Sequence, residues 1–236
     1  MKTRLAVILS LLLMALASAA MADSMNGNYY IIPENHPDAN KTITGLQTGY
    51  VQSTLGPDDL PVVTPFGQTS GNISDVNGLG EILWWSTASP NGVTFEKNQA
   101  DTLPLNFPSN FFPDGHSDNA NGFRAVHWTG TFNLASPGSV TFTLGADDDA
   151  FVFVDGVLAV DAGGVKPLTP VPTVVTGLGA GSHTVELFFD DRHVTQSGVQ
   201  FSADVAITPV PEPTSLALLG TGLVGAVGAI RRKLLR

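Results

Sequence analysis

The sequence predicts an all-β domain, a β-sandwich or jelly roll built from antiparallel sheets. Beyond residue 120, segments such as 139–144 and 199–207 alternate apolar and polar residues. Turns containing Gly and Pro separate these short segments, and the chain holds 25 Gly and 16 Pro. No window between residues 23 and 103 keeps a 3.6-residue apolar period, so we expect little helix there. Period-two segments with one polar face are typical of antiparallel sheets packed on a single core.

The N-terminus predicts an export signal rather than part of the fold. Met1–Arg4 is a short basic start, and Leu5–Leu16 is apolar apart from one serine. Ala20 and Ala22 form an A-x-A cleavage site before Asp23. Residues 1–22 are therefore predicted to be a secretory signal peptide, removed in the mature protein. A permanent membrane anchor is the alternative, but the apolar run is short and cleavable.

One folded domain is predicted between residues 23 and 208. Residues 23–103 read as loop-rich, with short strands at 28–32, within 45–55 and at 93–95, and an apolar cluster at Leu83–Trp85. Strand patterns are clearer further on, at 126–134, 139–144, 151–154, 185–189 and 199–207. No linker or repeat indicates a second folded domain.

The segment 144–161 is the centre of the predicted sandwich. Three acids, Asp147, Asp148 and Asp149, precede an apolar run that Asp155-Gly156 interrupts. Asp-Gly between two apolar runs predicts a two-residue hairpin, because both turn positions need positive φ. The arm 151–154 is apolar at every position and is expected to be a central strand. The three acids lie at the open end of this hairpin, where they repel one another unless water or a cation neutralises them.

Charge excludes one class of partner. The chain has 11 basic and 21 acidic residues, and six of the basic ones lie at its two ends. Five basic residues thus remain against all 21 acids between positions 23 and 212. Such a surface repels phosphate backbones, so nucleic acid is not an expected partner. Divalent cations or neutral polysaccharides suit it better. The chain has no cysteine, so disulfides cannot stabilise it.

The run 145–165 resembles the central motif of the fibro-slime domain, a relative of the PA14 domain. Further pieces fit in order at 110–115, 123–132, 188–193 and 197–201, so the resemblance covers about 105–207. It independently implies a β-sandwich. In calcium-binding PA14-type adhesins, two adjacent aspartates chelate the ion beside a bound sugar, in some relatives across a cis peptide bond. Asp147 and Asp148 match that pair, whereas Asp149 stands where many PA14 members have glycine.

Asp147, Asp148 and Asp149 are therefore the candidate calcium ligands, since calcium takes several hard oxygens. The alternative interpretation is that these acids cap loop amides and stay solvated. Asp155 is expected to make the turn. Arg192 is expected to neutralise buried carboxylates of the Asp147 loop, and a structural pairing is favoured over catalysis for it. The further possible structural partners are the neighbours of Arg192, namely Asp190 and Asp191.

The C-terminus predicts a second targeting signal. Pro211-Glu212-Pro213 precedes 16 uncharged residues, 215–230, and a basic cluster of Arg231, Arg232 and Lys233. As a helix, 215–230 spans roughly 24 Å, slightly less than a ~30 Å hydrocarbon core. The pattern resembles the PEP-CTERM sorting signal, here 209–236, which implies recognition and removal by an exosortase in Gram-negative bacteria that make exopolysaccharide. A permanent single-span anchor is the alternative.

No motif indicates an enzyme. The chain lacks a Gly-x-Ser-x-Gly elbow, a His-Glu-x-x-His sequence and a phosphate-binding glycine loop. The sequence therefore predicts an exported cell-surface or exopolysaccharide-matrix protein with a non-catalytic carbohydrate-binding or adhesion module and a possible calcium site. A passive matrix or tail-anchored protein without ligand is the first alternative, and a secreted glycan hydrolase is the second.

Overall fold

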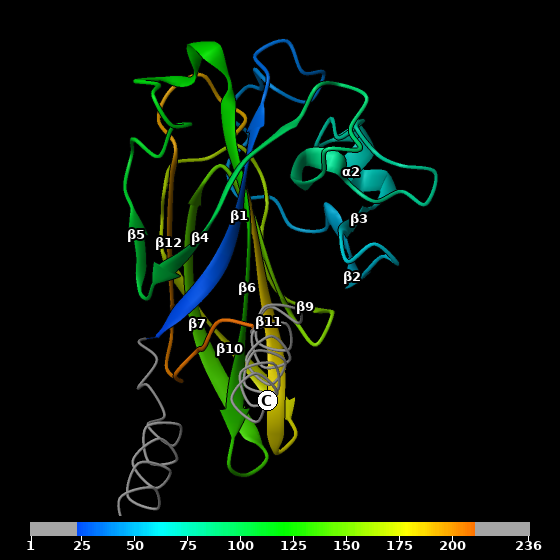
Figure 1. Ribbon diagram of the computed structural model, residues 1–236. Helices are drawn as coiled ribbons and strands as arrows, with labels where there is room; N and C mark the ends of the chain where they lie inside the picture. The colour runs from blue at the N-terminus through cyan, green and yellow to red at the C-terminus, as the bar shows by residue number, and fades with distance from the viewer. Residues whose placement is uncertain (1–22, 211–236) are drawn as a thin grey trace, which may run out of the picture.

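The computed structural model describes residues 23–210, which form two antiparallel sheets (Figure 1). The larger sheet has eight strands, which in spatial order are β3 (Pro61–Val63), β2 (Val51–Leu55), β9 (Val157–Ala162), β8 (Asp149–Val154), β11 (Gly181–Asp190), β6 (Phe123–Leu134), β1 (Ser24–Ile32) and β4 (Thr94–Thr102). The smaller sheet has four, β10 (Val171–Leu178), β7 (Gly138–Asp147), β12 (Gly198–Ala203) and β5 (Leu105–Phe107). The predicted all-β sandwich is confirmed.

The main core lies between the two sheets, where the inward side chains of period-two strands meet. Trp128 on β6 and Phe189 on β11 face Phe142 on β7 and Phe201 on β12, and all four are almost fully buried. Phe142 and Phe201 stack with their ring centroids 5.7 Å apart. Each such aromatic side chain buries a large apolar area, so this layer supplies much of the hydrophobic stabilisation.

A second core covers the outer face of the larger sheet. The segment 33–93 folds over it and carries the short helices α2 (Pro65–Thr69) and η1 (Leu83–Trp85), with α2 lying beside the long strands in Figure 1. Trp85 packs edge-on against Phe188 at 5.0 Å between centroids. Both faces of β8 are consequently covered, and all six of its residues are buried. The prediction of a central strand at 151–154 is confirmed.

The bounds of strands with polar ends, and one edge strand, differ from the prediction. β1 begins at Ser24 rather than Asn28, because Met25 already packs in the core. β4 continues from the expected 93–95 to Thr102 through polar residues, since it is the exposed edge of its sheet. β10 was not predicted. It contains Pro172, which an edge strand tolerates because its outer N–H groups need no partner.

The Asp155-Gly156 turn joins β8 to β9 as predicted. Both residues have positive φ, 51° and 74°. Asp155 Oδ2 lies 2.6 Å from Nδ1 of His183 on β11, and Nε2 of that ring lies 3.1 Å from the carbonyl oxygen of Gly179. Acceptors on both ring nitrogens favour the imidazolium form, and the Asp155 hydrogen bond is the main cause of the raised His183 pKa. This contact ties the β8–β9 turn to the β10–β11 turn.

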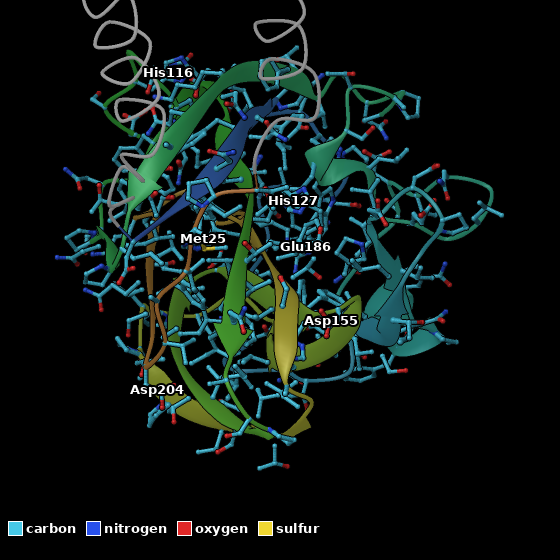
Figure 2. All side chains as sticks on the ribbon, turned by 60° about the horizontal axis from the view of Figure 1, so that its bottom comes forward. Met25, His116, His127, Asp155, Glu186 and Asp204 are labelled. Carbon is cyan, nitrogen blue, oxygen red and sulfur yellow. The ribbon has the colours of Figure 1, made fainter. Side chains whose placement is uncertain are left out.

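His127 and Glu186 lie side by side on the outer face of the larger sheet (Figure 2). Nε2 of His127 is 2.8 Å from a carboxylate oxygen of Glu186. The imidazole also stacks on Phe188, with 4.0 Å between ring centroids. The pair closes the edge of the second core with a polar contact.

The two ends of the described chain meet at one end of the sandwich. The Ser24 amide donates to the carbonyl of Ile207 at 3.1 Å, and Thr208 forms a two-way bridge with Thr131 on β6. Asp190 on β11 pairs with Ala125 on β6. Ala125 is six residues from Thr131 along β6, which corresponds to roughly 20 Å at about 3.4 Å per residue. The acids at the end of β11 therefore lie well along the sandwich from Ser24 and Thr208.

The predictions for the signal peptide 1–22 and the helix 215–230 lie outside the described residues. Within 23–210, no helix is long and apolar enough to cross a membrane.

Replacement of His183 by Gln is expected to lower the melting temperature most at acidic pH. A raised folded-state pKa means that the imidazolium contact stabilises the fold fully below the unfolded pKa of about 6.5 and that this stabilisation is lost as pH rises through the folded value. Melting curves of wild type and His183→Gln at pH 5.5 and pH 9 test this. An equal loss at both pH values would contradict the imidazolium assignment.

Candidate functional site

The candidate site is the meeting point of two strand ends. β7 ends at Asp147, β8 begins at Asp149, and Asp148 forms the junction between them. β11 ends at Asp190, so Asp191 and Arg192 begin the loop that leads to β12. The Asp147–Asp148 peptide bond is cis, as the resemblance to calcium-binding adhesins implied. All five acids of these two segments have less than a tenth of their surface exposed.

Arg192 and Asp149 form a buried ion pair beneath this junction. Arg192 Nε donates to Asp149 Oδ2 at 2.7 Å, and a second guanidinium nitrogen lies 2.7 Å from the same oxygen. The third donates to the Gly71 carbonyl at 2.7 Å, and the guanidinium carbon stands 4.8 Å from the Trp84 ring centroid. The expected structural pairing of Arg192 with this loop is present, although it uses one carboxylate oxygen rather than two.

Asp149 does not belong with the other two acids. Its second oxygen, Oδ1, accepts the amide of Gly164 at 2.5 Å, so both oxygens are engaged away from Asp147 and Asp148. The expectation that all three acids form one ligand set is corrected on this point. The physical reason is that Arg192 and the Gly164 amide already hold both oxygens of the Asp149 carboxylate.

Asp147 and Asp148 line a small pocket of about 40 Å³. Asp148 accepts two backbone amides, from Lys166 at 3.1 Å and from Arg192 at 2.8 Å. Burial, with the neighbouring Asp148 charge, raises the pKa of Asp147 to about 7. Burial and the Asp149 charge also raise the pKa of Asp148. The pair therefore resists carrying two negative charges unless a proton or a cation is shared between them.

Asp190 and Asp191 are buried without adequate partners. Neither carboxylate oxygen of Asp190 has a hydrogen bond, and the nearest cation is Arg192 Nε at 3.9 Å. Asp191 Oδ1 accepts the amide of His193 at 3.3 Å, while its Oδ2 is buried without a partner. Burial raises the pKa of both groups well above the usual range, and for Asp191 the next cause is the charge of Asp148.

Lys166 supplies the second cation near the loop. Its ammonium donates to the carbonyl oxygens of Asp148, Ala162 (2.7 Å) and Gly164 (3.4 Å). Its charge stabilises ionised Asp147, but burial lowers the pKa of the lysine itself. The ammonium thus occupies a cradle of backbone carbonyls beside the acid pair. Sequence reasoning missed this residue, because a single lysine after a glycine pair carries no recognisable pattern.

Asn119 is the other residue that sequence reasoning missed. It lies in the short helix η2 (Asn119–Asn121) and is fully buried. Its side-chain amide donates to the carbonyls of His193 at 2.8 Å and Gln196 at 3.2 Å. It therefore shapes the loop whose residues His193, Thr195 and Gln196 complete the wall of the small pocket.

The donor set suits a hard cation. Asp147 and Asp148 offer carboxylate oxygens at the pocket, and the buried Asp191 Oδ2 lacks any donor. Calcium prefers such oxygens and accepts backbone carbonyls as well. Within residues 23–210, however, no three His, Cys, Asp or Glu side chains are grouped closely enough to hold a metal by themselves. A cation here would need loop carbonyls or further oxygens besides the acid pair.

Removal of the Arg192 charge is expected to destabilise the fold strongly. Arg192→Met leaves Asp149 buried and unpaired, which typically costs about 3–5 kcal/mol. The double variant Arg192→Met with Asp149→Asn should lose clearly less, because the unpaired charge is gone. Urea unfolding of wild type, of the single variants Arg192→Met and Asp149→Asn, and of the double variant gives the coupling. Additive losses would show that the ion pair does not link the two segments.

Asp147→Asn is expected to stabilise the protein at neutral pH. An aspartate with a raised folded pKa binds its proton longer in the folded state, so stability falls as pH rises from about 4 to about 7. The three-unit shift corresponds to at most about 4 kcal/mol, shared with Asp148. Melting curves from pH 3 to 9 should be flatter for the variant. The exposed Asp59, whose left-handed backbone suits asparagine, provides the control Asp59→Asn. An unchanged pH profile in Asp147→Asn would contradict the assignment.

Comparisons with known proteins locate two matches in the chain. Residues 113–209 match the model of the PA14 domain, and residues 209–233 match the PEP-CTERM protein-sorting motif. Protein psiQ of Dictyostelium discoideum is 25% identical over 188 residues, which are 70% of this chain and 19% of that protein. The chain thus spans about a fifth of the length of this curated relative.

Solved PA14 domains are among the similar structures. The PA14 domain of the antifreeze protein MpAFP is 13% identical with a TM-score of 0.42, covering 84% of this chain and 97% of that one. The PA14 sugar-binding domain from an RTX adhesin is 16% identical with a TM-score of 0.37, covering 79% and 96%. The PEP-CTERM match indicates export and a surface location in Gram-negative bacteria. The chain carries a PA14 domain followed by a PEP-CTERM protein-sorting motif.

Proposed function

We propose that the protein is a surface or matrix module that binds carbohydrate at the Asp147–Asp148 pocket with the help of calcium. The observation that carries the proposal is the excess of buried carboxylates at this end of the sandwich. Asp147, Asp148, Asp190 and Asp191 all have raised pKa values. The positive charges beside these four acids come from Arg192, which is paired with Asp149, and from Lys166. A divalent cation would relieve this repulsion.

Asp147 and Asp148 would hold the ion, and the unpartnered Asp191 Oδ2 favours a positive charge nearby. A bound calcium supplies coordination sites for the vicinal hydroxyls of a sugar. The 193–196 loop, held by Asn119, would give the other wall of the sugar site. The PA14 match and the RTX adhesin domain that is described as sugar-binding are consistent with this role.

The position of the pocket also supports a binding role. The pocket lies well along the sandwich from Ser24 and Thr208, which are near the limits of the described residues 23–210. The sorting motif begins at residue 209, directly after the last bridge to β6. A protein held through the segment that follows Thr208, either by the exosortase during sorting or by an anchor, presents the pocket outward to exopolysaccharide.

Calcium is expected to bind wild type saturably and to raise its melting temperature. A ligand at a hundred times its dissociation constant stabilises the folded state by about 2.7 kcal/mol. Titration calorimetry and melting curves with calcium, on wild type and Asp148→Asn, test this, with Asp59→Asn as the control for loss of one charge.

Loss of binding and of the melting shift in Asp148→Asn alone would locate the ion at this loop and justify a screen of polysaccharides. If wild type neither binds calcium nor is stabilised by it, the calcium-assisted mechanism is wrong. If it also fails to bind any polysaccharide, a passive matrix component is the better description. Turnover of a polysaccharide by the purified protein would instead favour the hydrolase alternative.

A further inference from the structure

A larger cavity adjoins the acid pocket. It has a volume of about 470 Å³ and opens between the two sheets on the side where β9 and β10 face each other. Its walls are mostly aliphatic, with Leu144 and Ala146 of β7 opposite Val160 and Ala162 of β9. This volume lies within the range of roughly 300–1,000 Å³ typical of small-molecule sites.

The mouth of the cavity is apolar as well. Leu46, in the loop before β2, and Val171, at the start of β10, both line it and have 58% and 50% of their surface exposed. Ile43, which lines the acid pocket, is 65% exposed. Exposed aliphatic side chains grouped around an opening are typical of a site that accepts an apolar group.

The acid pocket and the apolar cavity share a wall. Lys166 and Pro167 line both the acid pocket and the apolar cavity. The Lys166 ammonium is held by the carbonyls of Asp148, Ala162 and Gly164, so this divider is fixed in place rather than loose. Ala146 on the cavity wall directly precedes Asp147 in the pocket. A molecule bound at the acids therefore has an aliphatic surface immediately beside it.

We propose that the ligand of this protein is a saccharide carrying an apolar substituent, such as an alkyl or acyl chain, with the sugar at Asp147–Asp148 and the substituent in the cavity. This inference rests on the proposed function, and it narrows the ligand to an amphiphilic glycoconjugate. The position of the polar pocket directly beside the aliphatic cavity favours it over a plain polysaccharide, which would leave the exposed Leu46 and Val171 without a role.

The test compares methyl and octyl glycosides of the same sugars in the presence of calcium. The panel contains β-galactosides, β-glucosides, β-N-acetylglucosaminides and α-mannosides, each below its critical micelle concentration, with the exported protein purified without detergent. Burying a few methylenes of the octyl chain should tighten binding roughly tenfold to a hundredfold over the methyl glycoside.

Two neighbouring residues of β10 give matched variants. Thr173 lines the cavity, whereas Val174 is 59% exposed and does not. Thr173→Phe should fill the cavity and abolish the tighter binding of octyl over methyl glycosides. Val174→Phe places the same new side chain on the other face of β10 and should keep this difference in affinity. Melting curves of both variants show that each is folded. Because β10 is an edge strand that tolerates aromatic residues, neither change is expected to disrupt the sheet.

The outcomes separate this inference from the proposed function. Methyl glycosides that bind as tightly as octyl ones would overturn the inference and leave carbohydrate binding intact. If no glycoside of either series binds, the proposed function fails and the inference fails with it. Octyl glycosides that bind equally well to Asp148→Asn would show that the cavity takes any amphiphile, which also overturns the glycoconjugate assignment.

Discussion

The Arg192–Asp149 ion pair holds together the parts of the protein that matter for its site. Its carboxylate lies at the start of β8, its guanidinium follows β11, and the same guanidinium contacts Gly71 and Trp84 of the covering segment. Three stretches distant in sequence thus meet at one buried charge pair. Because the pair is almost completely buried, its geometry is tightly constrained. The backbone amide of Arg192 also donates to the Asp148 carboxylate at the junction.

This arrangement leaves an imbalance of charge. Five buried acids lie around two cations, and one of those cations is committed to Asp149. A core selected for stability alone would replace such carboxylates by apolar or amide side chains, because burying unpaired charge is costly. Their presence at a strand junction is the kind of local violation expected where function constrains the fold.

Much of this fold could be predicted, for clear physical reasons. Alternation along residues 139–144 and 199–207 gave two strands of the smaller sheet, and Asp155-Gly156 gave the central hairpin. The covering segment 33–93 was harder, because its order comes from buried side-chain hydrogen bonds, such as those that Asp38 accepts from Ser74 and Trp84. Such contacts leave no periodic trace in a sequence.

The candidate site likewise combines features that the sequence predicts with features that it does not. The position of Asp147 and Asp148 followed from the hairpin and the resemblance, whereas the separation of Asp149 depended on which face of β8 meets Arg192. Lys166 and Asn119 act by donating hydrogen bonds to backbone carbonyls, and for Asn119 the carbonyl of His193 lies 74 residues further along the chain. A sequence does not show which carbonyls will be within reach of a given side chain, so neither role could be inferred before the fold was known.

The pairing of both chain ends has a mechanical consequence. A cell-surface protein that holds a polymer at one end and is retained at the other carries tension between them. If the proposed function holds, such a force would act along β6 and β11, from the Thr131–Thr208 bridge to Asp190. Hydrogen bonds between these strands lie across the direction of pull, so many must shear together before the strands slide. The orientation of these strands therefore suits the sandwich to resist a force applied along β6 and β11.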